Sequence, residues 1–285
     1  MHFFCDDSNS MYFTVFFLIL LALVGADDEF VDKSQPDTET SLTVEDFEHA
    51  KLIQQNESEV FNSSEMYHQD LFEGDIGSFL STYCFIRFTN FHRRETGETR
   101  TDLRRAVLAA AIEEYAKLTC IRIVPKTSAD NDYVHIAPIR GCSSNIGRIG
   151  EGSKLAGGMQ RMSLVSGCLH KGIIVHEFMH ALGFFHEQAR ADRDNYVTVY
   201  YENIQPGMES QFHSRPLSEI DHMGTQYDYQ SVMHYDTTAF SKNGRPTILP
   251  KQQGVTIGQR RGLSPTDIYK INTMYGCSAG WQIAF

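Results

Sequence analysis

The chain has 285 residues, of which 41% are hydrophobic, and a formal net charge of −11. This length suits one large domain or two small ones with a buried core. The sequence has no repeat of solenoid or propeller type, and it has no basic stripe of the kind that binds nucleic acid.

The charge is divided unevenly along the chain. Residues 27–83 carry 15 acidic side chains against Lys33 and Lys51, a net of −13, whereas residues 84–285 have a net charge of +4. One interpretation is a solvated acidic leader. The other is a pro-segment whose charge complements the body that it covers.

The start of the chain is typical of a targeting segment. Residues 11–24 form a run of 14 apolar or near-apolar residues, which is short for a membrane span and right for the core of a signal peptide. Gly25 and Ala26 are small residues that suit cleavage. We therefore expect a signal peptide over residues 1–26, a secreted protein and no stable membrane association. Because no Lys or Arg precedes the apolar run, an uncleaved membrane anchor is the alternative.

Secretion affects how the six cysteines are interpreted. Cys5 would leave with the signal peptide, so five remain, of which four can form two disulfides in an oxidising compartment. Spacing alone leaves the pairing open, and the lack of a Cys-x-x-Cys pair argues against a thiolate zinc site. Asn56 and Asn62 lie in glycosylation sequons within the acidic leader, which fits a surface segment.

Secondary-structure patterns predict an α+β body. Within residues 27–70 only Val44, Phe47, Ala50 and Ile53 have helical spacing, which indicates one helix at most. From there the sequence predicts strands over residues 85–88, 120–124 and 133–136, a helix capped by Thr101 or Asp102 and ending near Leu118, and loops with short strands over residues 141–158.

A second helix is expected over residues 170–182, where Gly183 ends it, and the chain beyond it is turn-rich. A last helix is predicted after Ser264, which is a good cap, with Pro265 and Asp267 suited to its first turn. The expected architecture is a small sheet with helices in one half and a looser half that ends in a helix.

Residues 176–180 carry the central chemical motif, His-Glu-x-x-His. Positions four apart share one face of a helix, so the imidazoles of His176 and His180 can hold one ion. Glu177 can reach a water on that ion. For this short pattern alone, the alternative is a pair of partly buried helix histidines.

The next six residues extend the motif to a third histidine. Glycine adopts a positive φ at no steric cost, so the chain can turn at Gly183 and bring His186 back to the metal. Three nitrogen ligands leave a fourth position open, as in catalytic zinc sites. The complete pattern is typical of metzincin proteases, which also have a methionine turn. Met233, 47 residues after His186, is the candidate, although a lone methionine is ordinarily core filler.

Several longer stretches resemble the astacin family. They are residues 186–197, with the sequence HEQARADRDNYV, residues 231–235, with the sequence SVMHY, residues 120–122, and a closing group that includes Leu263, Ser264, Asp267, Ile271, Asn272, Tyr275 and Cys277. The resemblance covers about residues 84–277. It implies a two-lobed metzincin-type domain over residues 84–285, with one Zn²⁺ per chain.

The resemblance also assigns roles to individual residues. It implies that His176, His180 and His186 bind zinc, with Tyr235 as a fifth ligand in the resting enzyme. Glu177 would polarise the zinc-bound water and pass its proton to the leaving amine, and Tyr235 would then swing to the oxyanion of the tetrahedral intermediate. Met233 would form a hydrophobic floor beneath the metal.

The remaining implied features are structural. Glu187 would contact the mature N-terminus, and the family disulfides would be Cys120–Cys277 and Cys142–Cys168. In the leader, residues 72–75 resemble a motif of astacin pro-segments in which an aspartate coordinates the zinc and excludes water. Asp75 is the matching residue, and residues 27–83 would then be an inhibitory pro-segment. Outside the protease context these four residues are an ordinary acidic turn.

The sequence departs from the family pattern in two places. Residues 76–83, between Asp75 and the first expected strand, contain no Lys or Arg for an activating cut, and the nearest basic residues are Arg87, Arg93 and Arg94. Cys84 has no partner among the family pairs, so it is either a buried free thiol or a link between two chains. The chain ends eight residues after Cys277, so we expect a minimal enzyme without added modules.

Taken together, these features predict a secreted zinc endopeptidase zymogen that acts on proteins or peptides and is inhibited by its own pro-segment. The alternatives are a non-catalytic or permanently latent zinc-binding relative and a zinc hydrolase of another class. The family often favours acidic residues just after the cut. Lys242 and Arg245 are candidates for lining the cleft, or they are solvated surface charges.

Overall fold

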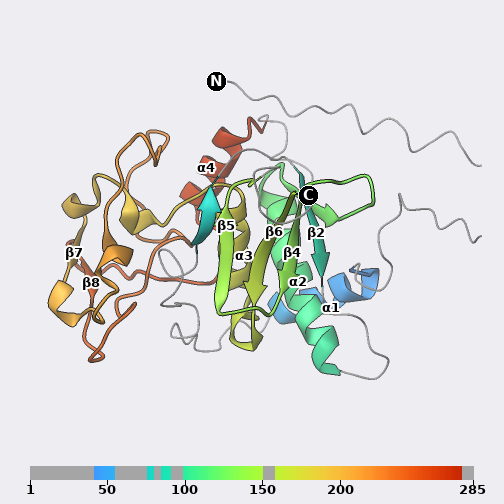
Figure 1. The fold of residues 1–285 in the computed structure, drawn as a ribbon, viewed down its shortest axis with the longest axis horizontal. Helices are drawn as coiled ribbons and strands as arrows, with labels where there is room; N and C mark the ends of the chain where they lie inside the picture. The colour runs from blue at the N-terminus through green and yellow to red at the C-terminus, as the bar shows by residue number, and fades with distance from the viewer. Residues whose placement is uncertain (1–41, 55–75, 80–84, 91–98, 150–157, 278–285) are drawn as a thin grey trace, which may run out of the picture.

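The computed structural model describes residues 42–54, 76–79, 85–90, 99–149 and 158–277. They form a mixed sheet backed by helices and a second half with little regular structure, on the left in Figure 1. This is the α+β architecture expected from the sequence. Among these described residues, none of the helices combines the length and the hydropathy needed to span a bilayer.

The larger sheet has six strands in the order β1-β5-β6-β4-β2-β3. They are β1 (Ile76–Phe79), β2 (Phe85–Asn90), β3 (Arg122–Pro125), β4 (Tyr133–Ala137), β5 (Cys142–Ile146) and β6 (Met159–Leu164). Strands β6, β4, β2 and β3 are parallel, whereas β5 runs antiparallel to β6 and β1 runs parallel to β5. The strand β1, which comes from the proposed leader, therefore forms one edge of the sheet.

Helix α2 (Thr99–Leu118) confirms the predicted helix and begins slightly earlier than expected. Its run of buried alanines favours a helix because alanine has the highest helix propensity. Val107, Ala111 and Tyr115 face the core, but Leu118 is 37% exposed, so the apolar face is narrower than the sequence suggested.

Helix α3 (Lys171–Ala181) lies beside α2 and behind the sheet, where it also contacts β5 (Figure 1). Every residue of α3 after Lys171 is buried. The hydroxyl of Tyr115 donates to the carbonyl of Val175 at 2.7 Å, and that of Tyr275 donates to the carbonyl of Leu182 at 2.8 Å. These contacts fix α3 in the main core.

The second half has its own smaller core. Its elements are the two-stranded sheet of β7 (Val197–Val199) and β8 (Ile248–Pro250) and several 3-10 turns, among them Glu187–Ala189, Arg193–Asn195, Tyr201–Asn203 and Glu209–Phe212. The core there is largely aromatic and includes Phe212, Tyr227, Tyr235 and Phe240. The looser second half predicted from the sequence is therefore present.

Helix α4 (Pro265–Met274) begins as predicted. The Ser264 hydroxyl accepts from the backbone N–H of Asp267, and the Asp267 carboxylate accepts from the backbone N–H of Ser264. This capping box satisfies two N–H groups that a helix start otherwise leaves without a partner. Ile271 and Tyr275 are buried and attach the helix to the main core, whereas Met274 is largely at the surface.

The four cysteines in the described part of the chain form two disulfides, Cys120–Cys277 and Cys142–Cys168. These are the pairs that the resemblance implied. The strand predicted over residues 120–124 begins instead at Arg122, because Cys120 is engaged with Cys277.

In the leader, helix α1 (Val44–Gln54) confirms the weak helical pattern, with Ala50 buried and Val44 exposed to solvent. Several other predictions lie outside the described residues. They concern the signal peptide, Asp75, Cys84 and the sequons at Asn56 and Asn62.

Candidate metal centre

Three histidines meet in the interior where α3 ends. Candidate ligand atoms of His176, His180 and His186 all lie within 4.8 Å of one another, and all three residues are buried. Their ring centroids are 4.6 to 5.2 Å apart. The helix aligns the first two rings because they are four residues apart, as the sequence predicted.

Backbone carbonyls fix the orientation of two of these rings. Nδ1 of His176 donates to the carbonyl of Val232 at 2.8 Å, and Nδ1 of His180 donates to that of Phe184 at 2.7 Å. In a neutral imidazole this leaves Nε2 with its lone pair. The Nε2 atoms of His176 and His186 are only 3.3 Å apart. Such a convergence of ring nitrogens, held by hydrogen bonds from behind, fits a zinc ion.

Gly183 makes the turn that brings His186 back to the other two rings. Its φ is +103°, a conformation that side chains with a Cβ rarely adopt. Its N–H donates to the carbonyl of His180 at 2.8 Å, and the N–H of Phe184 donates to the carbonyl of Met179 at 3.2 Å. The helix therefore ends immediately before the chain reverses toward the third histidine.

A second glycine sets the position of α3 at its start. A Cβ built on Gly172 would lie 1.7 Å from the carbonyl oxygen of Arg260. The first turn of the helix thus packs directly against the backbone of the segment that precedes α4. The sequence pattern did not single out this glycine, because the close approach is to a residue far away along the chain.

Glu177 and Tyr235 lie close to the histidine cluster. Glu177 is fully buried and follows His176 on α3. The ring of Tyr235 is also fully buried, with its centroid 4.7 Å from that of His186. Phe212 and Phe240 pack around it, and its backbone N–H donates to the side-chain oxygen of Gln188 at 3.0 Å. A buried carboxylate and a buried phenol therefore accompany the three imidazoles.

The turn that contains Met233 is braced from α4. Asp267 accepts from the Ser231 hydroxyl at 2.6 Å and from the Val232 N–H at 2.8 Å. Val232 in turn accepts from His176 through its carbonyl. Although burial raises the pKa of Asp267 to about 6, these hydrogen bonds act in the opposite direction. The capping residue of α4 is thus connected to a zinc-ligand candidate through one residue of the turn.

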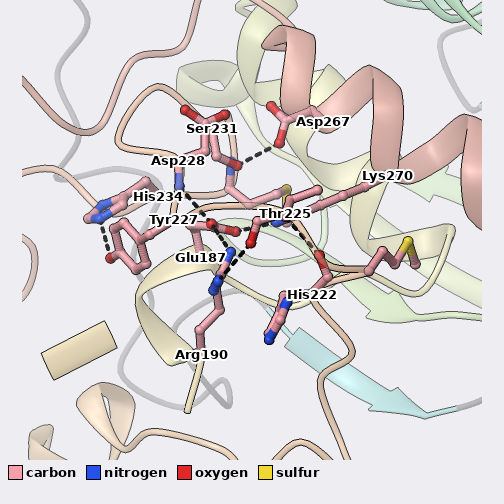
Figure 2. A network of polar contacts seen from close by, with 12 residues as sticks. Glu187, Arg190, His222, Thr225, Tyr227, Asp228, Ser231, His234, Asp267 and Lys270 are labelled. Carbon is pink, nitrogen blue, oxygen red and sulfur yellow. Dashed lines mark hydrogen bonds and ion pairs between the residues drawn. The ribbon is translucent and has the colours of Figure 1, made fainter. Parts of the chain in front are cut away.

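Glu187 is the centre of a buried polar network (Figure 2). One carboxylate oxygen accepts from Arg190 at 3.0 Å and from the backbone N–H of Asp228 at 2.9 Å. The other accepts from Lys270, which reaches it from α4 at 2.6 Å. The backbone N–H of Glu187 donates to the carbonyl of Met233 at 3.1 Å. The residue after His186 therefore joins the methionine turn to α4.

His234 is buried beside the same turn and does not point its nitrogens into the cluster. Its Nε2 accepts from the Tyr227 hydroxyl at 2.7 Å, and its Nδ1 donates to the carbonyl of Tyr235 at 2.8 Å. Burial lowers the pKa of His234 to about 4, so its ring is neutral at physiological pH. Its contacts indicate a structural histidine.

The sequence analysis did not assign functional roles to three residues of this framework: Lys270, Asp267 and Arg190. Their partners are distant in sequence, and a buried lysine resembles any surface lysine in a single sequence. The only local signal was Asp267 in the capping pattern of α4. The cleft-lining candidates Lys242 and Arg245 are both exposed.

Comparisons with known proteins agree with this geometry. The family model for Astacin, which is described as a peptidase family, matches residues 94–276. Zinc metalloproteinase nas-15 of Caenorhabditis elegans is 44% identical over 88% of this chain, which covers 48% of that protein. Zinc metalloproteinase nas-13 of the same organism is also 44% identical, with 60% of its length covered. The chain thus spans about half to three-fifths of these two relatives.

A solved structure has the same fold. High choriolytic enzyme 1, a hatching enzyme zinc-protease from the medaka fish Oryzias latipes, matches with a TM-score of 0.58 and 34% identity, over 77% of this chain and 98% of that one. The fold and the three-histidine cluster define a metzincin-type domain. The chain belongs to the astacin family.

Proposed function

We propose that this chain is a zinc-dependent endopeptidase that hydrolyses peptide bonds in proteins. The observation that carries the proposal is the buried convergence of His176, His180 and His186, with two of the rings oriented by backbone carbonyls. The family and the zinc metalloproteinase names of its relatives support the same activity.

In this proposal each nearby side chain has one task. Bound zinc lowers the pKa of a coordinated water toward neutrality and polarises the peptide carbonyl. Glu177 accepts a proton from the attacking water on its carboxylate and delivers it to the leaving amine. Tyr235 donates its phenolic hydrogen to the carbonyl oxygen as negative charge develops there, after serving as a fifth ligand in the resting enzyme.

Met233 has a supporting role in the proposal. It is buried, its N–H donates to the Ser231 hydroxyl at 3.1 Å, and its carbonyl accepts from Glu187. A residue held at both its N–H and its carbonyl suits a rigid apolar floor beneath the histidines. Its thioether is not needed as a ligand.

We further propose that residues 27–83 act as an inhibitory pro-segment of the domain over residues 84–285. The support is β1, which adds to the edge of the sheet beside β5. Extended peptides bind enzymes by adding a strand to such an edge, so β1 would occupy the place of a substrate. Asp75 directly precedes β1 in the sequence, and its role as a zinc ligand in the zymogen is part of this proposal.

Secretion is the proposed destination, with residues 1–26 as a signal peptide. Two disulfides in the body suit an oxidising compartment. Asn56 and Asn62 would then carry glycans. Exposed Lys242 and Arg245 are candidates for contacts with acidic residues of a protein substrate.

The test is to express the full chain in a secreting eukaryotic host and to cut the recovered protein within residues 80–84. Hydrolysis of denatured casein is then followed before and after the cut, with a zinc chelator, and after zinc is restored. The proposal expects activity that appears on cutting, disappears with the chelator and returns with zinc. The mass of the secreted chain shows whether residues 1–26 have been removed.

A different result would favour the latent relative. If the cut protein is folded, contains one zinc per chain and has lost its leader, yet does not hydrolyse casein, the endopeptidase proposal is wrong. The three-histidine cluster would then hold a structural or signalling ion.

A further inference from the structure

Helix α1 of the leader packs against α2 of the body, on the side of the molecule away from β7 and β8 (Figure 1). A capping pair starts α1, in which the N–H and the hydroxyl of Thr43 donate to Asp46 at 2.6 Å and 3.0 Å. Asp46 therefore has a fixed position in the first turn, on the face that meets α2.

The contact centres on a buried ion pair. Nε of Arg105 lies 3.2 Å from both carboxylate oxygens of Asp46, and Nη2 lies 2.9 Å from Oδ2. Both side chains are only 1% exposed. Burial raises the pKa of Asp46, but the hydrogen bonds from Arg105 and Thr43 outweigh it and hold that pKa below its usual range. Each charge therefore depends on the other.

Small residues bring the two helices close together around this pair. Ala50 of α1 is fully buried against Ala109 and Ala110 of α2, with Leu42 and Phe47 packed at the margin. Since alanine has only a methyl group, the helix backbones can approach more closely than larger side chains permit. The surface is specific in both charge and shape.

We propose that α1 is a docking helix that keeps the leader bound to the body after the chain is cut, with Arg105 as the residue that recognises Asp46. The inference rests on the proposed zymogen. A cut within residues 80–84 breaks the chain but removes none of the contacts between α1 and α2. Residues 27–83 contain no cysteine, so the retention is non-covalent.

The consequence is a leader that binds at two places. Its docking helix α1 holds to α2, and its strand β1 adds to β5. Linking two weak contacts raises the effective concentration of each, so β1 remains on the sheet edge until α1 also detaches. Activation then requires a cut followed by dissociation, and the second step depends on a surface far from the metal.

The experiment uses the full chain with a specific protease site inserted in residues 80–84. After the cut, size-exclusion chromatography and mass spectrometry measure the fraction of leader fragment that co-elutes with the body at a series of dilutions. The unaltered leader is expected to co-elute. Asp46→Asn is expected to weaken its retention by about 100-fold or more, because it leaves Arg105 without its charge partner.

Two further variants make the result specific. Ala50→Leu carries no charge change and is expected to release the leader by crowding Ala109 and Ala110. Glu48→Gln, the matched control on the same helix, removes an exposed ion pair with Lys51 and should leave retention unchanged within about threefold.

The proposal is overturned if the unaltered leader dissociates as readily as the Asp46→Asn leader, or if Glu48→Gln weakens retention equally. Co-elution needs no catalysis, so the result is independent of the proposed endopeptidase activity. A body that is inactive but retains its leader would contradict only the enzyme proposal. A leader that leaves at once from an active body would contradict only the docking helix.

Discussion

The carboxylate of Glu187 is shared between two segments that lie far apart in the sequence. Arg190 contacts one oxygen from three residues away, and Lys270 contacts the other from 83 residues away. Both cations are buried, so each stabilises a charge that water cannot solvate. This arrangement fixes the residue that directly follows His186.

We predict that Lys270→Met lowers the free energy of unfolding by about 2–3 kcal/mol, because it removes a charged hydrogen bond and leaves Glu187 with one cation. Urea unfolding of the zinc-free protein measures this. The control is Lys117→Met, which breaks an ion pair with Glu113 whose lysine is 55% exposed and should cost less than about 1 kcal/mol. Equal losses in both variants would contradict the role given to burial.

At this scale the sequence predicted ligands better than supports. His176, His180 and His186 have a fixed spacing around one helix end, so a local pattern identifies them. Lys270 and Asp267 act through partners 83 and 36 residues away, and a single sequence carries no signal for such pairs.

Among the elements, α3 determines the geometry of the site, and its end is more important than its length. His180 and His186 come together only because the chain reverses at Gly183 with a φ of +103°. The turn lies against α4, since a Cβ on Gly183 would meet the Met274 methyl at 3.4 Å.

We predict that Gly183→Ala weakens zinc binding by about tenfold or more, because a strained turn moves His186 away from the other ligands. Competition with a chromogenic chelator measures the affinity. Gly207→Ala is the control. Gly207 also has a positive φ, of +86°, but nothing lies within 4 Å of its built Cβ. Both variants should lose roughly 1 kcal/mol of stability from backbone strain. Unchanged zinc affinity in Gly183→Ala would disprove the turn's role.

Helices and strands were predictable where one period dominates the sequence. The spacing of apolar residues indicated α2, α3 and α4, and a single residue pair, Ser264 and Asp267, indicated where α4 begins. The order of the sheet was not predictable, because β1 and β5 pair across more than 60 residues and hydrophobic periodicity does not specify a partner.

At the scale of the whole molecule, the site lies where two cores meet. Val232 and Met233 belong to the main core, whereas Tyr235 belongs to the smaller one. The same short turn therefore transmits any displacement between the two halves to the metal ligands. The two-lobed architecture was expected from the family resemblance, and the composition of each core was not.

The disulfides act on the unfolded chain to different degrees. Cys120–Cys277 joins residues 157 apart, and Cys142–Cys168 joins residues 26 apart. Loop-closure entropy predicts that removing the first by a double Cys→Ala substitution costs roughly 5 kcal/mol and removing the second roughly 3.5 kcal/mol. Thermal unfolding of the two variants measures the order. A larger loss from the shorter loop would show that local packing, rather than chain entropy, decides the effect.

The central claim is that a zinc ion at the three histidines and the carboxylate of Glu177 together hydrolyse peptide bonds. The most direct test measures zinc content and casein hydrolysis in the same preparations of the cut wild-type protein and Glu177→Gln. We predict one zinc per chain in both proteins and a loss of activity of about a hundredfold or more in the variant, because glutamine cannot accept the proton. Equal activity at equal zinc content would contradict the account.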